Sequence, residues 1–301
     1  MYNGILLLNK EPGFTSHDAV AKLRGILRFR RIGHAGTLDP MAQGLLVMLL
    51  GKATRASEYA SGAEKEYIAD FILGVETDTQ DTTGNVLAEA PVDVTESQLR
   101  QALASFEGGY DQVPPMYSAI QKDGVRLYDL ARKGKEVERE SRFIALPLLE
   151  LLSFDPPRGK LRVRCSKGTY IRTLCHDLGQ RLGCGGAMSA LTRVQAGDFS
   201  LEDALTLGEV EQLVKEGTLQ QHILPVDRLF ASLPAVTLTE EGAKRARNGA
   251  HAAQKHLLSG EIPPVDALCR VYTPDGEFLM TGKGGLLDMG PPAIFCHKIF
   301  G

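Results

Sequence analysis

The apolar residues of this chain occur in short runs that are closed by glycine and proline. The longest uninterrupted run, Leu45 to Leu50, lies between two glycines and is far shorter than the roughly 20 residues that span a bilayer. A run of this length between turn residues is typical of a buried strand. Residues 4–9 and 67–73 are similar and predict two more strands. We therefore expect a core built from short strands and no association with a membrane.

Helices are expected between these strands. A hydroxyl side chain at Thr15 or Ser16 can cap a helix that continues to about residue 30, and residues 95–104 begin with a Thr-Gln capping box. Residues 171–182 predict a third helix, which ends at a glycine. Because strands and helices do not alternate in the regular rhythm of a parallel βαβ fold, the expected class of the main domain is α+β.

The length of 301 residues favours about two domains. From about residue 234 the chain changes to short segments separated by proline and glycine turns, which is typical of a small β-rich module. We therefore divide the chain into a main domain at residues 1–230 and a second domain at 234–301. Within the main domain, residues 121–142 are dense in both signs of charge, which indicates an exposed insertion.

Basic residues are concentrated in two segments, although the net charge of the chain is −3. Residues 22–31 contain five basic side chains and residues 158–172 contain six, and neither segment contains an acid. Alternation along a strand at 158–166 would place basic side chains on one face. Each segment alone is as well explained by a solvated face. Two such segments favour a polyanionic partner, which a segregated positive field can attract.

The sequence contains no motif for a metal, nucleotide or redox cofactor. The five cysteines are far apart without a CxxC pair, and neither HExxH, GxGxxG nor GxxxxGK[ST] occurs. We therefore expect chemistry without a cofactor. The N-terminus, MYNGILLLNKEPG, has neither the basic segment nor the cleavage site of a signal peptide, so we expect a cytoplasmic protein. We also expect it to act as a monomer.

The segment richest in chemically informative residues is Gly33-His34-Ala35-Gly36-Thr37-Leu38-Asp39-Pro40. Glycines on both sides of His34 predict a tight loop. Pro40 suits the first position of a helical turn, so we expect Asp39 at an N-cap, where free N–H groups favour the ionised carboxylate. A rigidly held carboxylate can act as a nucleophile or accept a weakly acidic proton. In isolation, however, an aspartate before proline is more often only a structural cap.

This segment is one of several that resemble the TruB family of tRNA pseudouridine synthases and that occur in the family's order. The resemblance extends over about residues 3–200. In one departure from the family pattern, Asn9 stands where the family often has Asp, and Glu11 lies between Lys10 and Pro12. The matching segments are Gly4–Gly13 (GILLLNKEPG), Thr15-Ser16, Gly33–Leu46 (GHAGTLDPMAQGLL), Gly51–Thr54 (GKAT), Lys65–Tyr67 (KEY), Pro114–Ala119 (PPMYSA) and Gly168–Leu174 (GTYIRTL).

The resemblance implies the pseudouridine-synthase α+β fold, with a central mixed or antiparallel sheet flanked by helices and a PUA-like domain at the C-terminus. It also implies an enzyme, a tRNA pseudouridine synthase that acts on the uridine at position 55 in the T-arm loop of tRNA. The reaction flips the base, breaks its N-glycosidic bond and rejoins the uracil through carbon, without a cofactor. Asp39 is the implied catalytic residue. Whether its carboxylate attacks C1′ of the sugar or removes a proton from C2′ stays open.

The resemblance implies five substrate-binding residues. Tyr67 matches an aromatic position suited to stacking on the base, and its phenol could also transfer a proton. His34 resembles a histidine that contacts RNA near the vacated base position, and Leu191 matches an apolar position in the pocket wall. Without the resemblance, Tyr67 is equally well explained as a half-buried strand aromatic, and Leu191 is better explained as a core residue. A core histidine is the plainer explanation of His34, but the glycines beside it argue against that.

The other two substrate-binding residues are Tyr170 and Arg172. Arg172 matches an active-site arginine and could pair with Asp39 and orient it. Tyr170 lies two residues earlier, so on an extended segment both side chains would face the same side. A surface ion pair or a phosphate contact is the plainer explanation of Arg172. The basic side chains that we expect at the RNA backbone are Lys10, Arg30, Arg31, Lys122, Arg126, Arg132, Arg164 and Lys167.

Two other functions are open. A catalytically silent RNA-binding or tRNA-folding module would use the same groove, and a guide-directed enzyme would apply the same chemistry to another RNA. The presence of Asp39, Tyr67 and Arg172 argues against a silent module. A short chain without extended charged tails favours an enzyme that acts on tRNA by itself.

Overall fold

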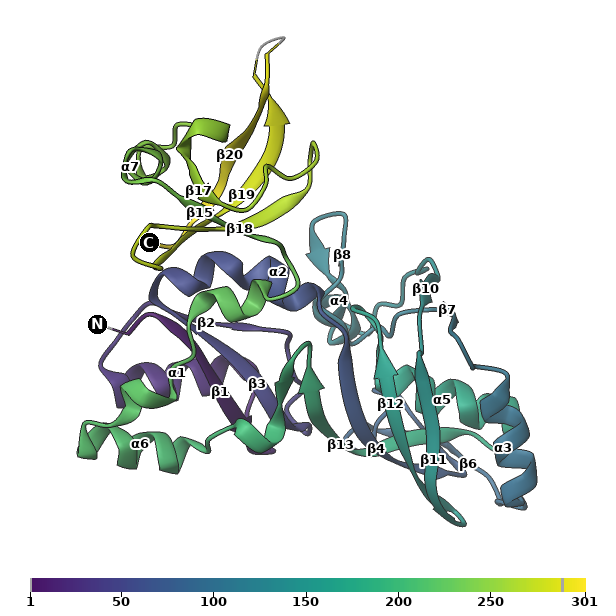
Figure 1. The fold of residues 1–301 in the computed structure, drawn as a ribbon. Coiled ribbons are helices and arrows are strands. Elements are labelled where there is room, and N and C mark those ends of the chain that lie inside the picture. The colour runs from purple at the N-terminus through teal and green to yellow at the C-terminus, as the bar shows by residue number, and fades with distance from the viewer. Residues whose placement is uncertain (1, 288–289) are drawn as a thin grey trace.

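A mixed sheet of eight strands forms the centre of the main domain. The computed structural model describes residues 2–287 and 290–301. Along the sheet, the order is β1 (Gly4–Lys10), β3 (Gln43–Leu50), β13 (Gly186–Ala196), β4 (Lys65–Leu73), β12 (Arg158–Cys165) and β11 (Leu148–Asp155), while β2 (Ile32–Ala35) pairs with β3 and β14 (Phe199–Ser200) with β13 (Figure 1). Strands β3 and β13 are parallel, and the other pairings in this sheet are antiparallel. The expected mixed sheet is therefore confirmed.

Two pairs of helices pack at the two ends of this sheet. Helix α1 (Ser16–Leu27) contacts α6 (Leu207–Glu216), which also contacts β1, and α5 (Ile171–Leu182) packs on β13 and contacts α3 (Glu96–Ala104) (Figure 1). One core cluster extends through both ends, because side chains of α1, the strands and α5 all belong to it. The α+β class is confirmed.

The helix boundaries follow the capping residues. Helix α1 begins after Thr15, which forms a capping box with Asp18, and α3 begins after Thr95 in the predicted capping box. Helix α5 occupies the predicted residues and ends at a left-handed Gly183. Helix α1 ends at Leu27 rather than near residue 30, because Arg28 adopts a left-handed conformation with φ of 47°.

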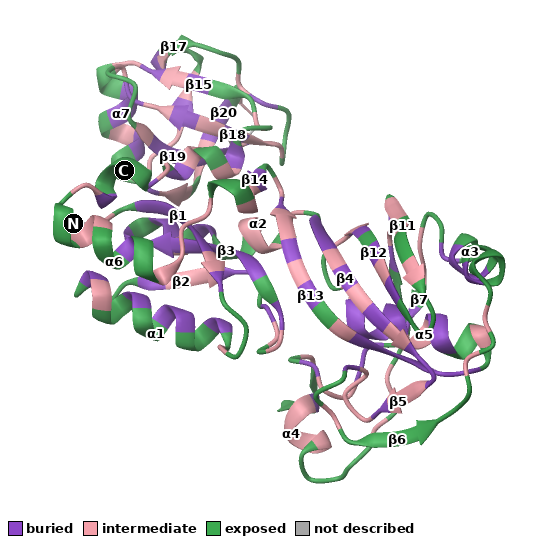
Figure 2. Ribbon diagram, turned by 90° about the horizontal axis from the view of Figure 1, so that it is seen from below, coloured by how far each residue is buried: buried purple, intermediate pink, exposed green. Residues whose placement is uncertain are grey.

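Strand β4 shows why the two faces of the sheet differ chemically. Its odd-numbered residues from Tyr67 to Leu73 are buried, and the even-numbered residues between them are partly exposed, as the alternating colours in Figure 2 show. The buried residues share a core cluster with Leu174 and Leu178 of α5. One face of β4 therefore packs under α5 while the other faces solvent.

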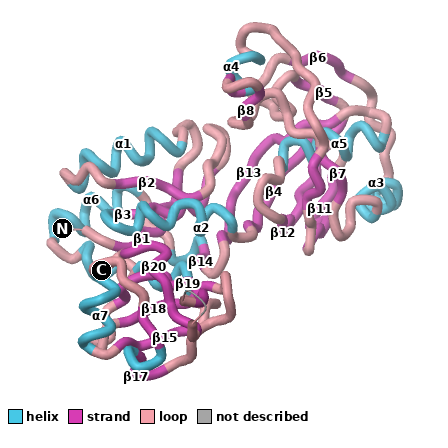
Figure 3. Tube along the Cα trace, turned by 90° about the horizontal axis from the view of Figure 1, so that it is seen from above, coloured by secondary structure: helices cyan, strands magenta, loops and turns pink. Residues whose placement is uncertain are grey.

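Short elements connect these strands and helices. The insertion at residues 121–142 is largely exposed, as predicted. Figure 3 shows α4, together with β8, at a distance from the C-terminal strands.

Among the residues that the structure describes, no helix is both long and apolar enough to cross a bilayer. The short elements are η1 (Gly51–Ala56), α2 (Ser57–Gly62), β5 (Val75–Thr77), β6 (Val86–Glu89), β7 (Tyr110–Gln112), β8 (Gln121–Lys122), β9 (Val125–Arg126), α4 (Leu127–Ala131), β10 (Arg142–Ile144), η2 (Leu201–Asp203), η3 (Leu219–His222) and η4 (Val226–Phe230).

The C-terminal residues form a second sheet with its own core. Its order is β16 (Ala252–Ala253), β20 (Pro292–Ile299), β19 (Phe278–Leu286), β18 (Leu268–Tyr272), β15 (Ala235–Leu238) and β17 (Leu257–Ser259), and α7 (Glu240–Arg247) and η5 (Gln254–His256) accompany it. Phe278 and Phe300 join Phe230 in an aromatic cluster with centroids 5.4–5.9 Å apart. Lys52 also donates to the Gly301 carbonyl at 2.6 Å. These contacts seat the module beside α2 of the main domain (Figure 1).

Candidate active site

The loop that contains Asp39 is fixed by its neighbours. At Gly36 the chain turns with φ of +75°, and a Cβ there would lie 3.2 Å from Nη1 of Arg193. Leu38 is buried, and its N–H donates to the hydroxyl of Ser16 at 2.8 Å. The same hydroxyl donates back to the Leu38 carbonyl at 3.2 Å. The residue before Asp39 is therefore tied to the first turn of α1.

Two expectations for this segment were wrong. Gly33, His34 and Ala35 belong to β2, so the loop begins only at Gly36. No helix follows Asp39, which instead starts a single turn in which the Ala42 N–H donates to the Asp39 carbonyl at 3.1 Å. Asp39 is therefore not an N-cap, and its carboxylate is held by a cation from another part of the chain.

Arg172 is that cation. Its Nε lies 2.8 Å from Oδ2 of Asp39, which is the ion pair expected from the sequence. The guanidinium also donates to the carbonyls of Thr79 at 3.1 Å and Tyr117 at 3.0 Å, and its Nη1 lies 3.9 Å from Oδ2 of Asp81. The side chain of Arg172 is 6% exposed and that of Asp39 is 38% exposed. The carboxylate thus meets a buried, fully oriented cation on one side and is accessible on the other.

Helix α5 determines where Arg172 points. Tyr170 is the N-cap of α5 and Arg172 is its second residue, in agreement with the helix predicted at residues 171–182, so the two side chains do not lie on one extended segment. The backbone of Tyr170 is held on both of its polar groups by the side chain of Gln112. Burial raises the pKa of the Tyr170 phenol above its ordinary value, so this side chain is uncharged at neutral pH.

Tyr67 and Arg193 face each other on β4 and β13. Tyr67 is 9% exposed, and burial raises the pKa of its phenol against the opposing effect of the Arg193 cation. Arg193 is 1% exposed and donates to the carbonyls of Leu45 at 2.7 Å and Gly36 at 2.9 Å. Arg193 therefore ties the start of the Asp39 loop, and the strand that follows this loop, to β13 beside Tyr67, a role that sequence reasoning missed. The sequence feature that could have indicated this role is the position of Arg193 two residues after Leu191, which places both side chains on one face of a strand.

Two lysines lie buried near this loop. Lys10 is 2% exposed and donates to the carbonyls of Phe14 at 2.7 Å and Glu11 at 3.0 Å. The expected phosphate contact at Lys10 conflicts with this burial, since its ammonium group is bonded within the protein. Burial lowers the pKa of Lys10 to about 8. Lys65 is 8% exposed, donates to the Ser61 carbonyl at 2.6 Å, and burial lowers its pKa to about 8 as well.

His34 and Leu191 lie on the strands of the central sheet. His34 is on β2 opposite Met48, and burial lowers the pKa of its imidazole, so the ring is neutral at neutral pH. Its buried Nδ1 has no hydrogen-bond partner among the described residues. Leu191 is 6% exposed on β13 and belongs to the core cluster that also contains Tyr67.

The other basic side chains divide into a group that pairs with carboxylates and a group that is exposed. On the open face of the sheet, Glu66 is 2% exposed and pairs with Arg162 at 2.6 Å and Arg164 at 2.7 Å. Lys160 lies 3.2 Å from Asp70, which is its register partner on β4. The basic face expected on β12 is thus partly neutralised by the acids of β4. The basic residues expected at the RNA backbone that are exposed are Arg30, Arg31, Lys122, Arg126, Arg132 and Lys167.

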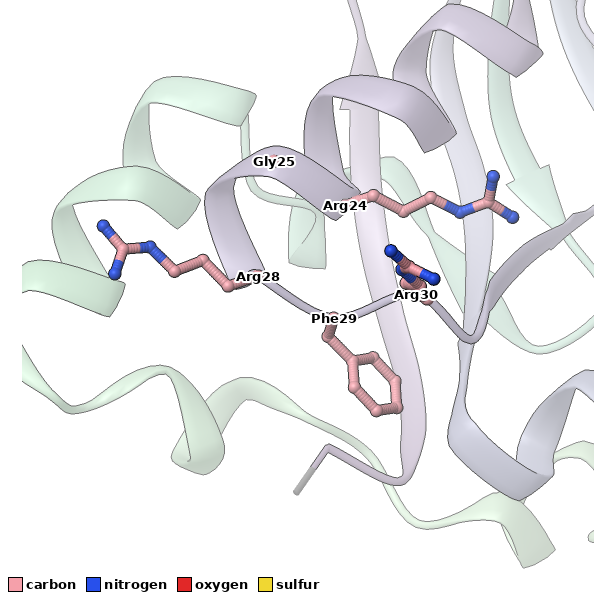
Figure 4. A pocket seen from close by; sticks show the side chains of 5 residues that line it. All are labelled: Arg24, Gly25, Arg28, Phe29 and Arg30. Atoms are coloured by element: carbon pink, nitrogen blue, oxygen red, sulfur yellow. The ribbon is translucent and has the colours of Figure 1, made fainter.

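A hollow at the C-terminal end of α1 gathers further arginines. It is lined by Arg24, Gly25, Arg28, Phe29 and Arg30. Figure 4 shows the Arg24 and Arg30 guanidinium groups on one side of Phe29 and that of Arg28 on the other. The basic segment at residues 22–31 therefore forms a cationic surface at the end of α1 that lies away from the Asp39 loop.

The loop between β5 and β6 supplies partners that sequence reasoning did not identify. Asp81 is 4% exposed, and its Oδ1 accepts from the hydroxyl groups of Thr79 at 2.9 Å and Thr83 at 2.5 Å. Gln80 has φ of +63° and accepts from the Thr173 hydroxyl at 2.7 Å. The only signal in the sequence was the run of Thr and Asp residues at 77–83, which is typical of a hydrogen-bonded turn.

Comparison with known proteins identifies the family. The model described as "TruB family pseudouridylate synthase (N terminal domain)" matches residues 24–171, and "tRNA pseudouridylate synthase B C-terminal domain" matches 172–231. Proteins named tRNA pseudouridine synthase B from Opitutus terrae and Pseudomonas aeruginosa are 52% and 47% identical, over 77% and 96% of this chain and 96% and 93% of their own lengths.

A solved structure agrees with this assignment. The "Structure of H/ACA RNP bound to a substrate RNA containing 2'-deoxyuridine" matches with a TM-score of 0.76 and 26% identity, over 99% of this chain and 85% of that chain. The expected pseudouridine-synthase fold is confirmed. The sequence and the fold thus agree that the chain belongs to the TruB family of pseudouridylate synthases.

Proposed function

We propose that this chain converts the uridine at position 55 of the tRNA T-arm loop into pseudouridine. The relatives are named tRNA pseudouridine synthase B, which supports tRNA as the substrate. The observation that carries the proposal is the 2.8 Å ion pair between Arg172 and the partly exposed Asp39. A carboxylate held in this way is suited to act on a sugar or a base that enters from the accessible side.

The residues around Asp39 suit a base that leaves its stack. Extracting a base costs a few kcal/mol, which contacts in the pocket must offset. The rings of Tyr67 and Tyr170 are partly or fully buried and uncharged, which suits stacking on uracil. The Asp39 carboxylate then either attacks C1′ or takes a proton from C2′. The N1–C1′ bond breaks, a C5–C1′ bond forms, N1 gains a proton and C5 loses one, so the product is an isomer.

The exposed basic side chains suit a grip on the phosphates around the T-arm loop. Arg30 and Arg31 follow α1, and Lys122, Arg126 and Arg132 lie on the insertion. Such contacts raise affinity without reading sequence. We propose that the enzyme works as a cytoplasmic monomer, and sedimentation with and without tRNA tests its oligomeric state.

Tritium release tests the proposed substrate. The protein is incubated with an unmodified tRNA transcript that is tritiated at uracil C5, beside an otherwise identical transcript with cytidine at position 55. We expect about one tritium per tRNA from the first transcript and none from the second, since C5 loses its hydrogen only when it becomes the glycosidic carbon. Equal release from both transcripts would refute position 55. Binding without release from either would favour a silent RNA-binding module.

A further inference from the structure

Gln112 holds the backbone of Tyr170 in a two-bond clamp. This glutamine ends β7 and is 2% exposed. Its Oε1 accepts from the Tyr170 N–H at 2.8 Å, and its Nε2 donates to the Tyr170 carbonyl at 3.0 Å. The side-chain amide therefore bonds to both the N–H and the carbonyl of Tyr170, as the backbone of a neighbouring strand would, and Tyr170 is the residue that precedes α5. A buried amide with both ends satisfied fixes its partner rigidly.

A further hydrogen-bond chain sets the orientation of this amide. Nε2 of Gln112 also donates to the Tyr110 hydroxyl at 2.8 Å, and that hydroxyl donates to Oδ2 of Asp177 at 2.8 Å. The Tyr110 hydroxyl carries one proton, which it donates to Asp177, so towards Gln112 it can only accept, and it accepts from the amide nitrogen. With the amide nitrogen of Gln112 directed to the Tyr110 hydroxyl, the amide oxygen is the atom that accepts from the Tyr170 N–H. Asp177 lies on α5, so β7 is hydrogen-bonded to this helix at two places: Gln112 bonds to the N-cap Tyr170, and Tyr110 bonds to Asp177.

The clamp is connected to the Asp39 site through α5 and through the chain after β7. Tyr170 has no side-chain cap of its own, and Arg172 lies two residues beyond it. The segment that follows Gln112 reaches Tyr117, whose carbonyl accepts from the Arg172 guanidinium at 3.0 Å. One short stretch therefore holds both the start of α5 and the guanidinium that pairs with Asp39.

We propose that Gln112 is a positioning residue for the isomerisation, because its amide sets the backbone at Tyr170 and thereby the geometry of Arg172 against Asp39. This inference rests on the proposed function. Gln112 itself is buried away from RNA, so it acts through Tyr170 and Arg172. Its loss should lower the turnover of bound substrate more than it weakens substrate binding.

Two substitutions at this position separate positioning from stability. Gln112→Met keeps the length of the side chain and removes every hydrogen bond of the clamp. Gln112→Glu keeps an acceptor for the Tyr170 N–H, and its protonated form regains one donor. The titratable groups that face this position are Tyr110 on β7, Asp177 on α5 and Tyr170. Gln212→Met is the matched control, since Gln212 is exposed on α6 and bonds only to Glu216.

The measurements are kcat and KM for tritium release from the T-arm substrate, with thermal unfolding of each variant. For Gln112→Met we expect kcat to fall about 10- to 100-fold, with KM within about 3-fold of the parent value and a fold that is stable at the assay temperature. For Gln112→Glu, kcat relative to the parent should rise as the pH falls from 8 to 6, because the protonated side chain restores a donor. Gln212→Met should match the parent.

Three outcomes would overturn the inference. Gln112→Met with parental kcat would show that the clamp does not position the site. A loss of activity that tracks unfolding and returns on cooling would show a purely structural role. A flat pH profile of Gln112→Glu relative to the parent would show that the donor does not matter. If the parent itself releases no tritium, the proposed function fails before the inference on Gln112 is reached, and both are abandoned.

Discussion

Replacing Arg172 by lysine keeps the positive charge beside Asp39 but removes the planar guanidinium that bonds to several acceptors at once. The guanidinium engages one carboxylate and two carbonyls, on Asp39, Thr79 and Tyr117, at 2.8–3.1 Å. These three acceptors are reached by three different nitrogens. A lysine has one nitrogen at the end of a flexible stem, so it cannot reproduce the fork. We therefore expect Arg172→Lys to retain the ion pair at best and to lose both carbonyl contacts.

The magnitude follows from these contacts. A hydrogen bond that involves a charged group contributes about 1.5–3 kcal/mol, and the Arg172 side chain is buried, so two lost bonds amount to about 3–6 kcal/mol. Part of this loss destabilises the fold, because the Thr79 and Tyr117 carbonyls lose their donor. If about 3–4 kcal/mol is lost from the transition state, the rate falls by about 100- to 1,000-fold.

Single-turnover tritium release with excess enzyme measures this rate directly. RNA binding to the T-arm stem-loop and thermal unfolding are measured in parallel, and we expect binding within about 3-fold of the parent. A rate for Arg172→Lys within about 3-fold of the parent, in a folded protein, would refute the reasoning, since the charge alone would then suffice. Exposed Arg100→Lys, whose i,i+4 pair with Glu96 lies on the surface of α3, is the matched control.

The remaining predictions concern stability. Burial lowers the pKa of Lys10 from 10.5 to about 8, so the unfolded chain binds more protons in this window and the residue adds to the free energy of unfolding as the pH rises through it. In urea titrations, the rise between pH 8 and 10 should be about 1–3 kcal/mol smaller in Lys10→Met than in the parent, and an unchanged rise would contradict the assignment. Burial alone would raise the pKa of Glu66, but hydrogen bonds from Arg164 and Arg162 outweigh it and lower the pKa below 4.5. The stability from this carboxylate is present above pH 4.5 and is lost as the pH falls through the folded-state pKa, so Glu66→Gln should cost about 1–3 kcal/mol at pH 7 and less near pH 3. A difference that does not depend on pH would count against this ion pair.

Much of the fold follows from local signals. Residues 45–50 and 171–182 predict β3 and α5 well, because an apolar run between glycines and an amphipathic segment before a glycine each have one stable structure. The block at Gly33–Ala35 was misread as a loop, since Gly33 is tolerated in a strand that pairs with β3. Pairing partners are set by the tertiary structure, which local sequence does not contain.

The part of the candidate site that could be predicted is the part in which the residue type itself indicates the partner, as with an aspartate and an arginine. The Asp39–Arg172 pair was expected from the family resemblance and is present at 2.8 Å. Lys10 was misassigned because sequence does not show burial, and a lysine can bond to backbone carbonyls as well as to phosphates. Asp81 and Gln112 were missed because their roles exist only in contacts between distant segments.

The central claim is that the Asp39 carboxylate performs the isomerisation. The most direct test compares tritium release by the parent and by Asp39→Asn, which keeps the size of the side chain and removes its charge. We predict about one tritium per tRNA from the parent, no detectable release from Asp39→Asn, and unchanged binding of the T-arm stem-loop by both. Release by Asp39→Asn at the parental rate would contradict the account and would move the chemistry to another residue.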